Sequence, residues 1–114
     1  MRWISKKFLP AIQGLKEAIK DSSIRIQMLI GTTVILFGLI YEFDPREWMW
    51  ILLCVFLVII SEVFNTAIEK LCNIVDNKEN DAIRIVKDLS ALAVLLSAIF
   101  SVLIGIMILK GELR

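Results

Sequence analysis

Three long apolar runs, separated by short polar segments, dominate the pattern of this sequence. Residues 89–109 contain no charged side chain, and an apolar helix of about 20 residues crosses the hydrocarbon core of a bilayer. The uncharged run 48–61 reaches that length if it continues past Glu62, and the run 26–41 does so if Arg25 snorkels toward the headgroups. The pattern therefore predicts three membrane spans, at residues 24–42, 48–68 and 89–109.

The segment before the first span is amphipathic, with apolar residues at three- and four-residue spacing and lysines mostly on the other side of the helical wheel. The apolar members are Ile4, Phe8, Ile12, Leu15 and Ile19. A basic amphipathic helix lies in the membrane surface, so we predict a surface helix over residues 3–21. Pro10 either kinks this helix or marks the first turn of its main part. A helix that only anchors the chain would show the same pattern.

Two short polar segments connect the predicted spans. Asp44 and Pro45 favour a tight turn between the first and second spans. Residues 76–81 are polar and lack apolar periodicity, which indicates a connection before a third helix that restarts near Asp81 or Ala82. The expected fold is an all-α membrane protein: one N-terminal amphipathic surface helix and three transmembrane helices, forming a single domain over residues 1–114.

Basic residues indicate how the spans are oriented. Before the first span they are Arg2, Lys6, Lys7, Lys16, Lys20 and Arg25. After the second span they are Lys70, Lys78, Arg84 and Lys87. The connection 42–47, in contrast, holds Arg46 among three acids. Because short loops rich in lysine and arginine stay in the cytoplasm, we expect a multi-pass protein whose N-terminus is cytoplasmic.

Composition narrows the class of protein further. The chain is 58% hydrophobic, above the usual share for globular proteins, and its net charge of +1 gives no reason to expect a nucleic-acid partner. The sequence has no histidine, which excludes histidine-based catalysis and histidine metal sites from this chain. Cys54 lies in the middle of a predicted span and Cys72 near the inner surface, so we expect two free thiols.

Polar side chains form a stripe along the second predicted span, because their spacing returns them to one side of a helix with 3.6 residues per turn. They are Glu62, Asn65, Glu69, Asn73 and Asp76. A carboxylate at the centre of a span costs roughly 2.5–3.5 kcal/mol, and Glu62 lies between that depth and the interface. Such a residue is a functional candidate. An alternative is that the helix has already left the membrane at these positions, and a carboxylate in water needs no functional explanation. That alternative suits Glu69 better than Glu62, because apolar residues flank Glu62.

Two carboxylates on one face near the inner surface suit metal-assisted phosphoryl transfer. Glu62 and Glu69 are about 10 Å apart along the helix axis, so one can accept a proton from an attacking hydroxyl while the other holds Mg²⁺. Lys87, which Asp88 follows, could neutralise nucleotide phosphates. A lysine that only snorkels to the membrane surface, next to an acid near the start of a helix, would give the same sequence pattern. Periodicity also leaves an ion or proton pathway open.

The segments EVFNTAIEKL and VKDLSALAVLL resemble the prokaryotic diacylglycerol kinase family, which also includes undecaprenol kinases. The family pattern is E-x-x-N-[ST]-A-I-E, a short loop, and K-D before an apolar third span, and the resemblance covers essentially the whole chain. It implies a homotrimer in the bacterial inner or plasma membrane, with active sites at the cytoplasmic surface. It also implies Mg²⁺-dependent transfer of the γ-phosphate of ATP to the hydroxyl of diacylglycerol or undecaprenol.

The resemblance implies roles for particular residues. Glu62 corresponds to the catalytic base, Asn65 to an active-site amide and Glu69 to a metal ligand. Lys87 would meet the nucleotide phosphates, and Asp88 would support the site from the third span.

Several positions depart from the family pattern, among them Leu92, which stands near a position of the third span that is often glycine or alanine. Ser22 stands in the register of a glutamate that is the family's second metal ligand, and the adjacent acid, Asp21, is the candidate replacement. Asn73 stands where the family often has an aspartate, which keeps a polar group and loses a charge.

The first hypothesis is therefore an integral membrane lipid kinase. The alternative is a non-catalytic relative that keeps the fold and binds nucleotide or lipid, which Ser22 and Asn73 motivate. A small transporter or ion-pathway subunit, motivated by Glu62 alone, is the third hypothesis. The lack of other charges in the spans argues against it.

Overall fold

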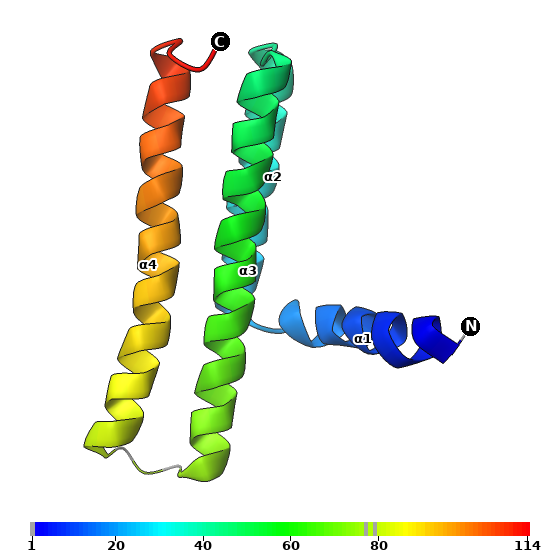
Figure 1. Cartoon of the computed structure of the whole chain (residues 1–114), viewed down its shortest axis with the longest axis vertical. Helices are drawn as coiled ribbons and strands as arrows, with labels where there is room; N and C mark the ends of the chain where they lie inside the picture. Colours follow the sequence, from blue (N-terminus) through cyan, green and yellow to red (C-terminus); the bar gives the residue numbers. More distant parts are fainter. Residues whose placement is uncertain (1, 77, 79) are drawn as a thin grey trace.

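The computed structural model describes residues 2–76, 78 and 80–114, with Ile4 described by its backbone alone. Within these residues every regular element is helical. The elements are the π-helix η1 (Ile4–Phe8) and the α-helices α1 (Leu9–Ala18), α2 (Ser22–Ile40), α3 (Pro45–Val75) and α4 (Asp81–Leu109). The predicted all-α architecture, a short N-terminal helix followed by three long apolar helices, is confirmed (Figure 1).

Helices α2, α3 and α4 are each long and apolar enough to cross a membrane. They run alongside one another, and α1 projects from them to the side (Figure 1). Two of these helices are longer than the spans predicted within them. Helix α3 continues past residue 68 to Val75, and α4 begins at Asp81, before residue 89. Both helices therefore extend beyond the predicted hydrocarbon layer at the same end, where their polar residues lie.

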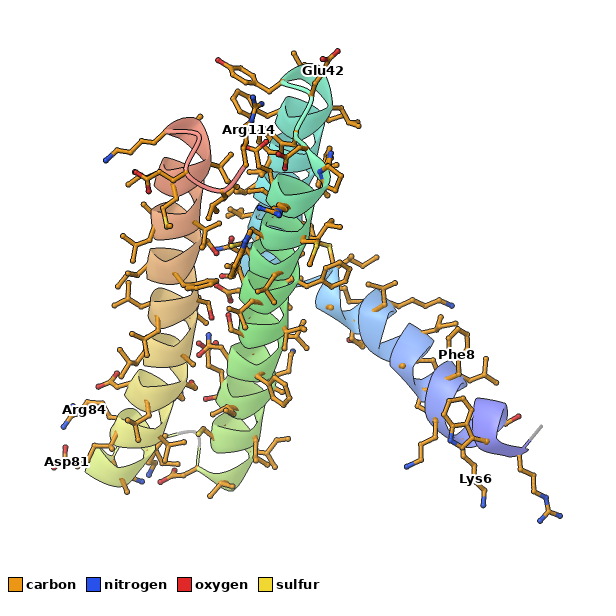
Figure 2. All side chains as sticks on the ribbon, turned by 45° about the horizontal axis from the view of Figure 1, so that its top comes forward. Lys6, Phe8, Glu42, Asp81, Arg84 and Arg114 are labelled. Atoms are coloured by element: carbon orange, nitrogen blue, oxygen red, sulfur yellow. The ribbon has the colours of Figure 1, made fainter. Side chains whose placement is uncertain are left out.

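The N-terminal helix keeps its large apolar side chains on its surface, and Figure 2 shows it standing apart from the other helices. The exposed apolar residues are Trp3, Phe8, Leu9, Ile12, Leu15 and Ile19. Pro10 occupies the first turn of α1, which is the second of the two expectations for this residue. The helix ends at Ala18, before the predicted limit at residue 21, because Asp21 has an extended backbone and caps α2. The side chain of Ile4 lies outside the described residues.

Two charged side chains define the junction between α1 and α2. Nη1 of Arg25 donates to the carbonyl oxygens of Ile19 at 3.1 Å and Lys20 at 3.2 Å. These carbonyls follow the end of α1, where a helix leaves acceptors unpaired and a cation is favourable. Oδ1 of Asp21 accepts from the amide of Ile24 at 3.1 Å, as an N-cap does. The surface helix thus ends, and the first long helix begins, within a few residues.

Two glycines bring α2 and α3 into close contact. A Cβ atom at Gly31 would lie 2.9 Å from Cγ1 of Val55, and one at Gly38 would lie 2.9 Å from the ring of Trp48. Small residues let membrane helices approach each other to such distances. The two helices therefore form a tightly packed hairpin.

The tight turn predicted at Asp44 is confirmed, and a hydrogen bond ties it to the segment after α4. Oδ1 of Asp44 accepts from the Glu47 amide at 3.0 Å, while Oε1 of Glu47 accepts from the Asp44 amide at 3.1 Å, which makes a capping box. The same Oε1 accepts from Nε of Arg114 at 3.1 Å. Figure 2 labels Glu42 and Arg114 at this end of the molecule.

Small and polar side chains mediate the packing of α3 against α4. Ser90 and Ser97 are buried on one face of α4, and an apolar cluster continues the interface toward the other end. The cluster consists of Ile51, Cys54, Ile104 and Ile108. Small residues at a helix interface permit close approach in a membrane. In the described chain Cys54 and Cys72 are free thiols, as predicted.

The polar connection between α3 and α4 leads from Asp76 to Asn80. The Asn80 side chain caps α4, and its Nδ2 donates to Oδ2 of Asp76 at 2.9 Å. Helix α4 begins at Asp81, as predicted. Two residues of the predicted connection, Asn77 and Glu79, lie outside the described residues.

Candidate active site

Glu62 is a buried acid on α3, with 7% of its surface exposed. Its Oε2 atom is shielded from solvent and has no hydrogen-bond partner among the described residues. The negative charges of Asp21, at the α1–α2 junction, and of Glu69, further along α3, both act on it. A buried polar atom without a donor is unfavourable. Glu62 is therefore available to a proton donor or a cation that enters the site.

Asn65 connects α3 to α4. Its Nδ2 donates to Oε1 of Glu69 at 3.0 Å, and its Oδ1 accepts from Oγ of Ser90 at 2.7 Å. The four-residue spacing of Asn65 and Glu69 places both on one face of α3. The amide thus joins an exposed carboxylate on α3 to a buried hydroxyl on α4.

Lys87 extends from α4 to α3 beside this network. Its Nζ donates to Oδ1 of Asn73 at 2.9 Å. Because the asparagine side chain is neutral, this bond orients the ammonium group without neutralising its charge. A lysine ammonium held in this way can meet an anionic phosphate as a point charge.

Asp88 forms an ion pair with Arg84 on the exposed side of α4. Its Oδ2 lies 3.4 Å from Nη1 of Arg84. Nη2 of the same arginine lies 3.8 Å from Oδ1 of Asp81, and Figure 2 labels these two residues. In the part of the chain that the structure describes, no hydrogen bond joins Asp88 to Lys87 or Asn65. The structure brings the other candidates of α3 and α4 together and leaves Asp88 beside them.

The α1–α2 junction contributes Asp21 to the site. Its charge acts on Glu62, while its Oδ1 caps α2. Ser22 is the exposed first residue of α2 and carries no charge. At this junction, the acid within electrostatic reach of Glu62 is therefore Asp21, one position before Ser22.

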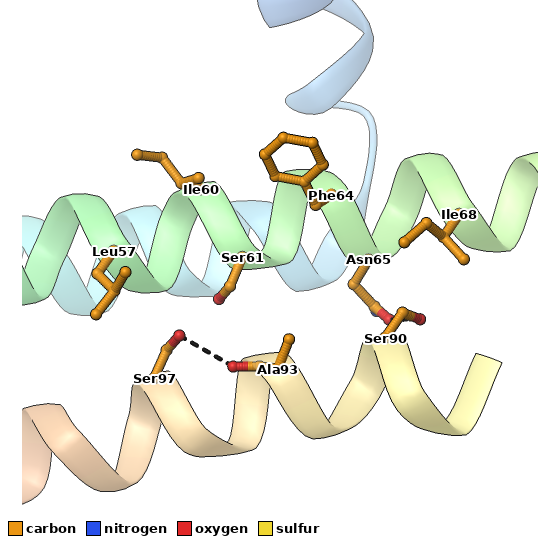
Figure 3. A pocket seen from close by; sticks show the side chains of 9 residues that line it. All are labelled: Leu57, Ile60, Ser61, Phe64, Asn65, Ile68, Ser90, Ala93 and Ser97. Atoms are coloured by element: carbon orange, nitrogen blue, oxygen red, sulfur yellow. Dashed lines mark hydrogen bonds between the residues drawn. The ribbon is translucent and has the colours of Figure 1, made fainter. Parts of the chain in front are cut away.

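An open crevice of about 330 Å³ lies between α3 and α4 (Figure 3). Of the candidate site residues, Asn65 lines it, whereas Glu62, Glu69 and Lys87 do not. Leu57, Ile60 and Phe64 of α3 contribute apolar walls, and Asn65 and Ser90 contribute polar atoms nearer the α3–α4 connection. Ligand sites commonly combine apolar walls with a few placed polar groups. Ser61 and Ser97 add hydroxyl groups further along the crevice (Figure 3). A mainly apolar surface with a few polar groups suits a lipid alcohol.

The sequence matches the family of prokaryotic diacylglycerol kinases over residues 10–109, from the start of α1 to the end of α4. The chain belongs to this family. It is also 28% identical over 109 residues to the undecaprenol kinase of Bacillus subtilis (strain 168), an alignment that covers 95% of this chain and 89% of that protein. The resemblance inferred from the sequence motifs is confirmed. By family membership the chain is a lipid kinase, and membership of a kinase family implies the use of ATP.

The acidic residues of this kinase fit a magnesium ion. Carboxylate oxygens are the ligands that Mg²⁺ prefers, and the buried carboxylate of Glu62 lies within reach of the negative charges of Asp21 and Glu69. Within residues 2–76, 78 and 80–114, no three Asp, Glu, His or Cys side chains converge in a geometry that could hold a metal ion. Mg²⁺ needs only one or two protein carboxylates when substrate phosphates supply further ligands. The unpartnered Oε2 of Glu62 is consistent with a cation nearby.

Ser90 is the residue of the site that the sequence analysis missed. It lies inside the uncharged run 89–109, where a serine looks like a small residue for helix packing. Its position three residues after Lys87 was an available signal, because residues at this spacing lie on the same side of a helix. The hydrogen bond to Asn65 is what distinguishes it.

Proposed function

We propose that this lipid kinase transfers the γ-phosphate of ATP to the hydroxyl of a membrane lipid alcohol. Undecaprenol is the first acceptor to consider, because of the similarity to an undecaprenol kinase, and diacylglycerol is the second. The observation that carries the proposal is the buried Glu62 carboxylate, whose Oε2 lacks a hydrogen-bond partner within the described residues.

In this proposal Glu62 is the general base. Its carboxylate accepts the proton of the lipid hydroxyl as that oxygen attacks the γ-phosphorus. The acceptor's apolar chain lies along the crevice, and its hydroxyl lies near Asn65. The low exposure of Glu62 keeps water from competing with the lipid hydroxyl for the phosphoryl group.

The remaining candidates handle the nucleotide. Lys87, oriented by its bond to Asn73, meets the phosphates of ATP. Glu69 and Asp21 hold Mg²⁺, which when bound neutralises charge on the phosphates. Asp88 supports the start of α4 through its ion pair with Arg84. Nucleotide binding and proton transfer are thus assigned to different residues. The proposed site consists of Asp21, Glu62, Asn65, Glu69, Lys87 and Asp88.

We also propose that residues 1–114 form one kinase domain in the inner or plasma membrane of a bacterium, with a cytoplasmic N-terminus. The basic residues around α1 and the α3–α4 connection support this orientation. The exposed apolar residues of α1 fit a helix that lies in the membrane surface. A homotrimer is implied by the family resemblance, and the molar mass of the purified protein in detergent tests it.

The proposed activity can be tested with purified protein in detergent micelles, labelled ATP, Mg²⁺ and one lipid alcohol at a time. Glu62→Gln preserves the size of the side chain and removes the base, so we expect kcat to fall about 10²–10⁴-fold. Glu112→Gln is the matched control. Glu112 is exposed after the far end of α4, and this variant should equal the parent protein.

The outcomes separate the hypotheses. Phosphorylation of undecaprenol, of diacylglycerol or of both identifies the acceptor. If the parent phosphorylates neither lipid nor any other long-chain alcohol, and Glu62→Gln behaves like the parent in every assay, the proposal is wrong. Binding of ATP without turnover would instead establish the non-catalytic alternative.

A further inference from the structure

Three side chains form a hydrogen-bonded series from α4 to the exposed end of the site. Oγ of Ser90 donates to Oδ1 of Asn65 at 2.7 Å, and Nδ2 of Asn65 donates to Oε1 of Glu69 at 3.0 Å. Ser90 is 8% exposed and also lines the crevice beside Asn65 (Figure 3). The series therefore connects a buried hydroxyl to a candidate metal ligand through a candidate active-site amide.

The chemistry of the three groups allows one orientation of the amide. An ionised carboxylate only accepts hydrogen bonds, so the NH₂ group of Asn65 faces Glu69 and its Oδ1 faces Ser90. Oδ1 then needs a donor, and the hydroxyl of Ser90 is the one that the described residues supply. The carbonyl oxygen of Lys87, 2.9 Å from the same hydroxyl, is the competing acceptor, but carbonyls inside a helix already accept from the helix backbone.

Ser97 provides an internal comparison. It is also 8% exposed, lies on the same face of α4 and lines the same crevice. Its hydroxyl donates to the carbonyl oxygen of Ala93 at 3.0 Å, within its own helix (Figure 3). Ser97 thus shares the burial and the helix face of Ser90 and differs from it in the hydrogen-bond partner of its hydroxyl.

We infer that Ser90 is a positioning residue, whose hydroxyl holds the Asn65 amide in the orientation that keeps Glu69 in place. This role rests on the proposed kinase function. Without the hydroxyl, Oδ1 of Asn65 loses its donor, and the amide can rotate about its last side-chain bond. Glu69 then loses a fixed donor. The consequence is a site with the same lipid crevice and a less ordered metal-binding end.

The kinetic test compares Ser90→Ala, Ser90→Thr and Ser101→Ala in the lipid phosphorylation assay. We expect Ser90→Ala to lower kcat about tenfold, the rate equivalent of one hydrogen bond, and to change KM for the lipid by less than about twofold. Ser90→Thr keeps a hydroxyl and should recover most of kcat. Ser101→Ala removes the same atoms from a half-buried serine of α4 that lies outside the crevice and donates to the carbonyl oxygen of Ser97 at 2.9 Å, so kcat should stay within about twofold of the parent.

A spectroscopic measurement tests the hydrogen bond without turnover. In ¹⁵N-labelled protein in micelles, the Asn65 side-chain NH₂ signals should shift in Ser90→Ala, return toward the parent position in Ser90→Thr and remain in place in Ser101→Ala. A parent protein that turns over no lipid alcohol overturns the proposed function, and the catalytic part of this inference with it. An active parent in which Ser90→Ala and Ser101→Ala give equal kcat, or in which Ser90→Ala raises only the lipid KM, overturns the positioning role alone.

Discussion

Removal of the Arg114 side chain should destabilise the folded protein, because it takes the charged partner from a buried carboxylate. Glu47 is 1% exposed, and its Oε1 accepts from Nε of Arg114 and from the Asp44 amide, each at 3.1 Å. Arg114→Ala leaves the capping-box bond intact. It leaves the buried charge of Glu47 without a cation and separates the segment after α4 from the start of α3.

The size of the effect follows from the exposure of the two partners. A hydrogen bond to a charged group contributes about 1.5–3 kcal/mol, and breaking a fully buried ion pair costs about 3–5 kcal/mol. The Arg114 side chain is 56% exposed, so solvent screens the pair and the larger figure does not apply. We therefore expect Arg114→Ala to lower the free energy of unfolding by about 1–2 kcal/mol.

The measurement is unfolding of the micelle-bound protein by increasing fractions of denaturing detergent, followed by helical circular dichroism. Lys110→Ala is the control, because Lys110 is a second exposed cation after α4 that forms no ion pair among the described residues. Glu47→Gln keeps an acceptor for the cap and removes the stranded charge, so adding it to Arg114→Ala should recover part of the stability. Equal unfolding of Arg114→Ala and Lys110→Ala, or no coupling with Glu47→Gln, would refute the reasoning.

Substitutions at Gly31, Asp21 and Glu42 test three separate features of the fold and site. Gly31→Ala places a Cβ 2.9 Å from Cγ1 of Val55 and should lower the free energy of unfolding by about 1–3 kcal/mol in the same assay. Gly105→Ala is its control, because a Cβ there would meet no described atom within 4 Å, and it should not destabilise the protein. Asp21→Asn keeps an oxygen to cap α2 and removes the charge, so it should preserve stability and raise the Mg²⁺ concentration needed for half-maximal turnover. Asp21→Ala should in addition lose about 1 kcal/mol of stability with the cap. Glu42→Gly should stabilise the turn by about 1 kcal/mol, because Glu42 has a φ of 53°, in the left-handed region.

The three long helices were predictable because a bilayer constrains both length and polarity. A chain that crosses the hydrocarbon core needs an unbroken apolar helix, and such a run is visible without any knowledge of its neighbours. The tight turn at Asp44 and the start of α4 at Asp81 were predictable for a related reason. Turns and helix caps depend on residues within a few positions of one another.

The end of α1 was predicted less well. Apolar periodicity in the N-terminal segment continues to Ile19, yet α1 ends at Ala18 because Asp21 caps the next helix and Arg25 caps this one. Hydrophobicity was a poor guide to the hydrogen bonds that end this helix. Helix α3, in contrast, continues past the predicted span to Val75, as the polar stripe from Glu62 to Asp76 indicated.

Part of the candidate site was also predictable from the sequence. Spacing along α3 identified Glu62, Asn65 and Glu69 as one face, because a single helix has a known periodicity. The family motifs E-x-x-N-T-A-I-E and K-D then associated this face with a lipid kinase, and the match over residues 10–109 established the family.

The partners of these side chains on other helices were not visible in the sequence. Ser90 bonds to Asn65 across 25 positions of the chain, Lys87 bonds to Asn73 and not to a carboxylate, and Arg114 reaches Glu47 across 67 positions. Each of these bonds requires two helices to have a particular rotation and a particular offset along their axes. Those quantities depend on how whole surfaces of small and apolar side chains pack, so the periodicity of one helix does not contain them. The one-dimensional pattern was sufficient for the spans and for the polar face of α3, while the bonded network around Glu69 came from the packing of α3 against α4.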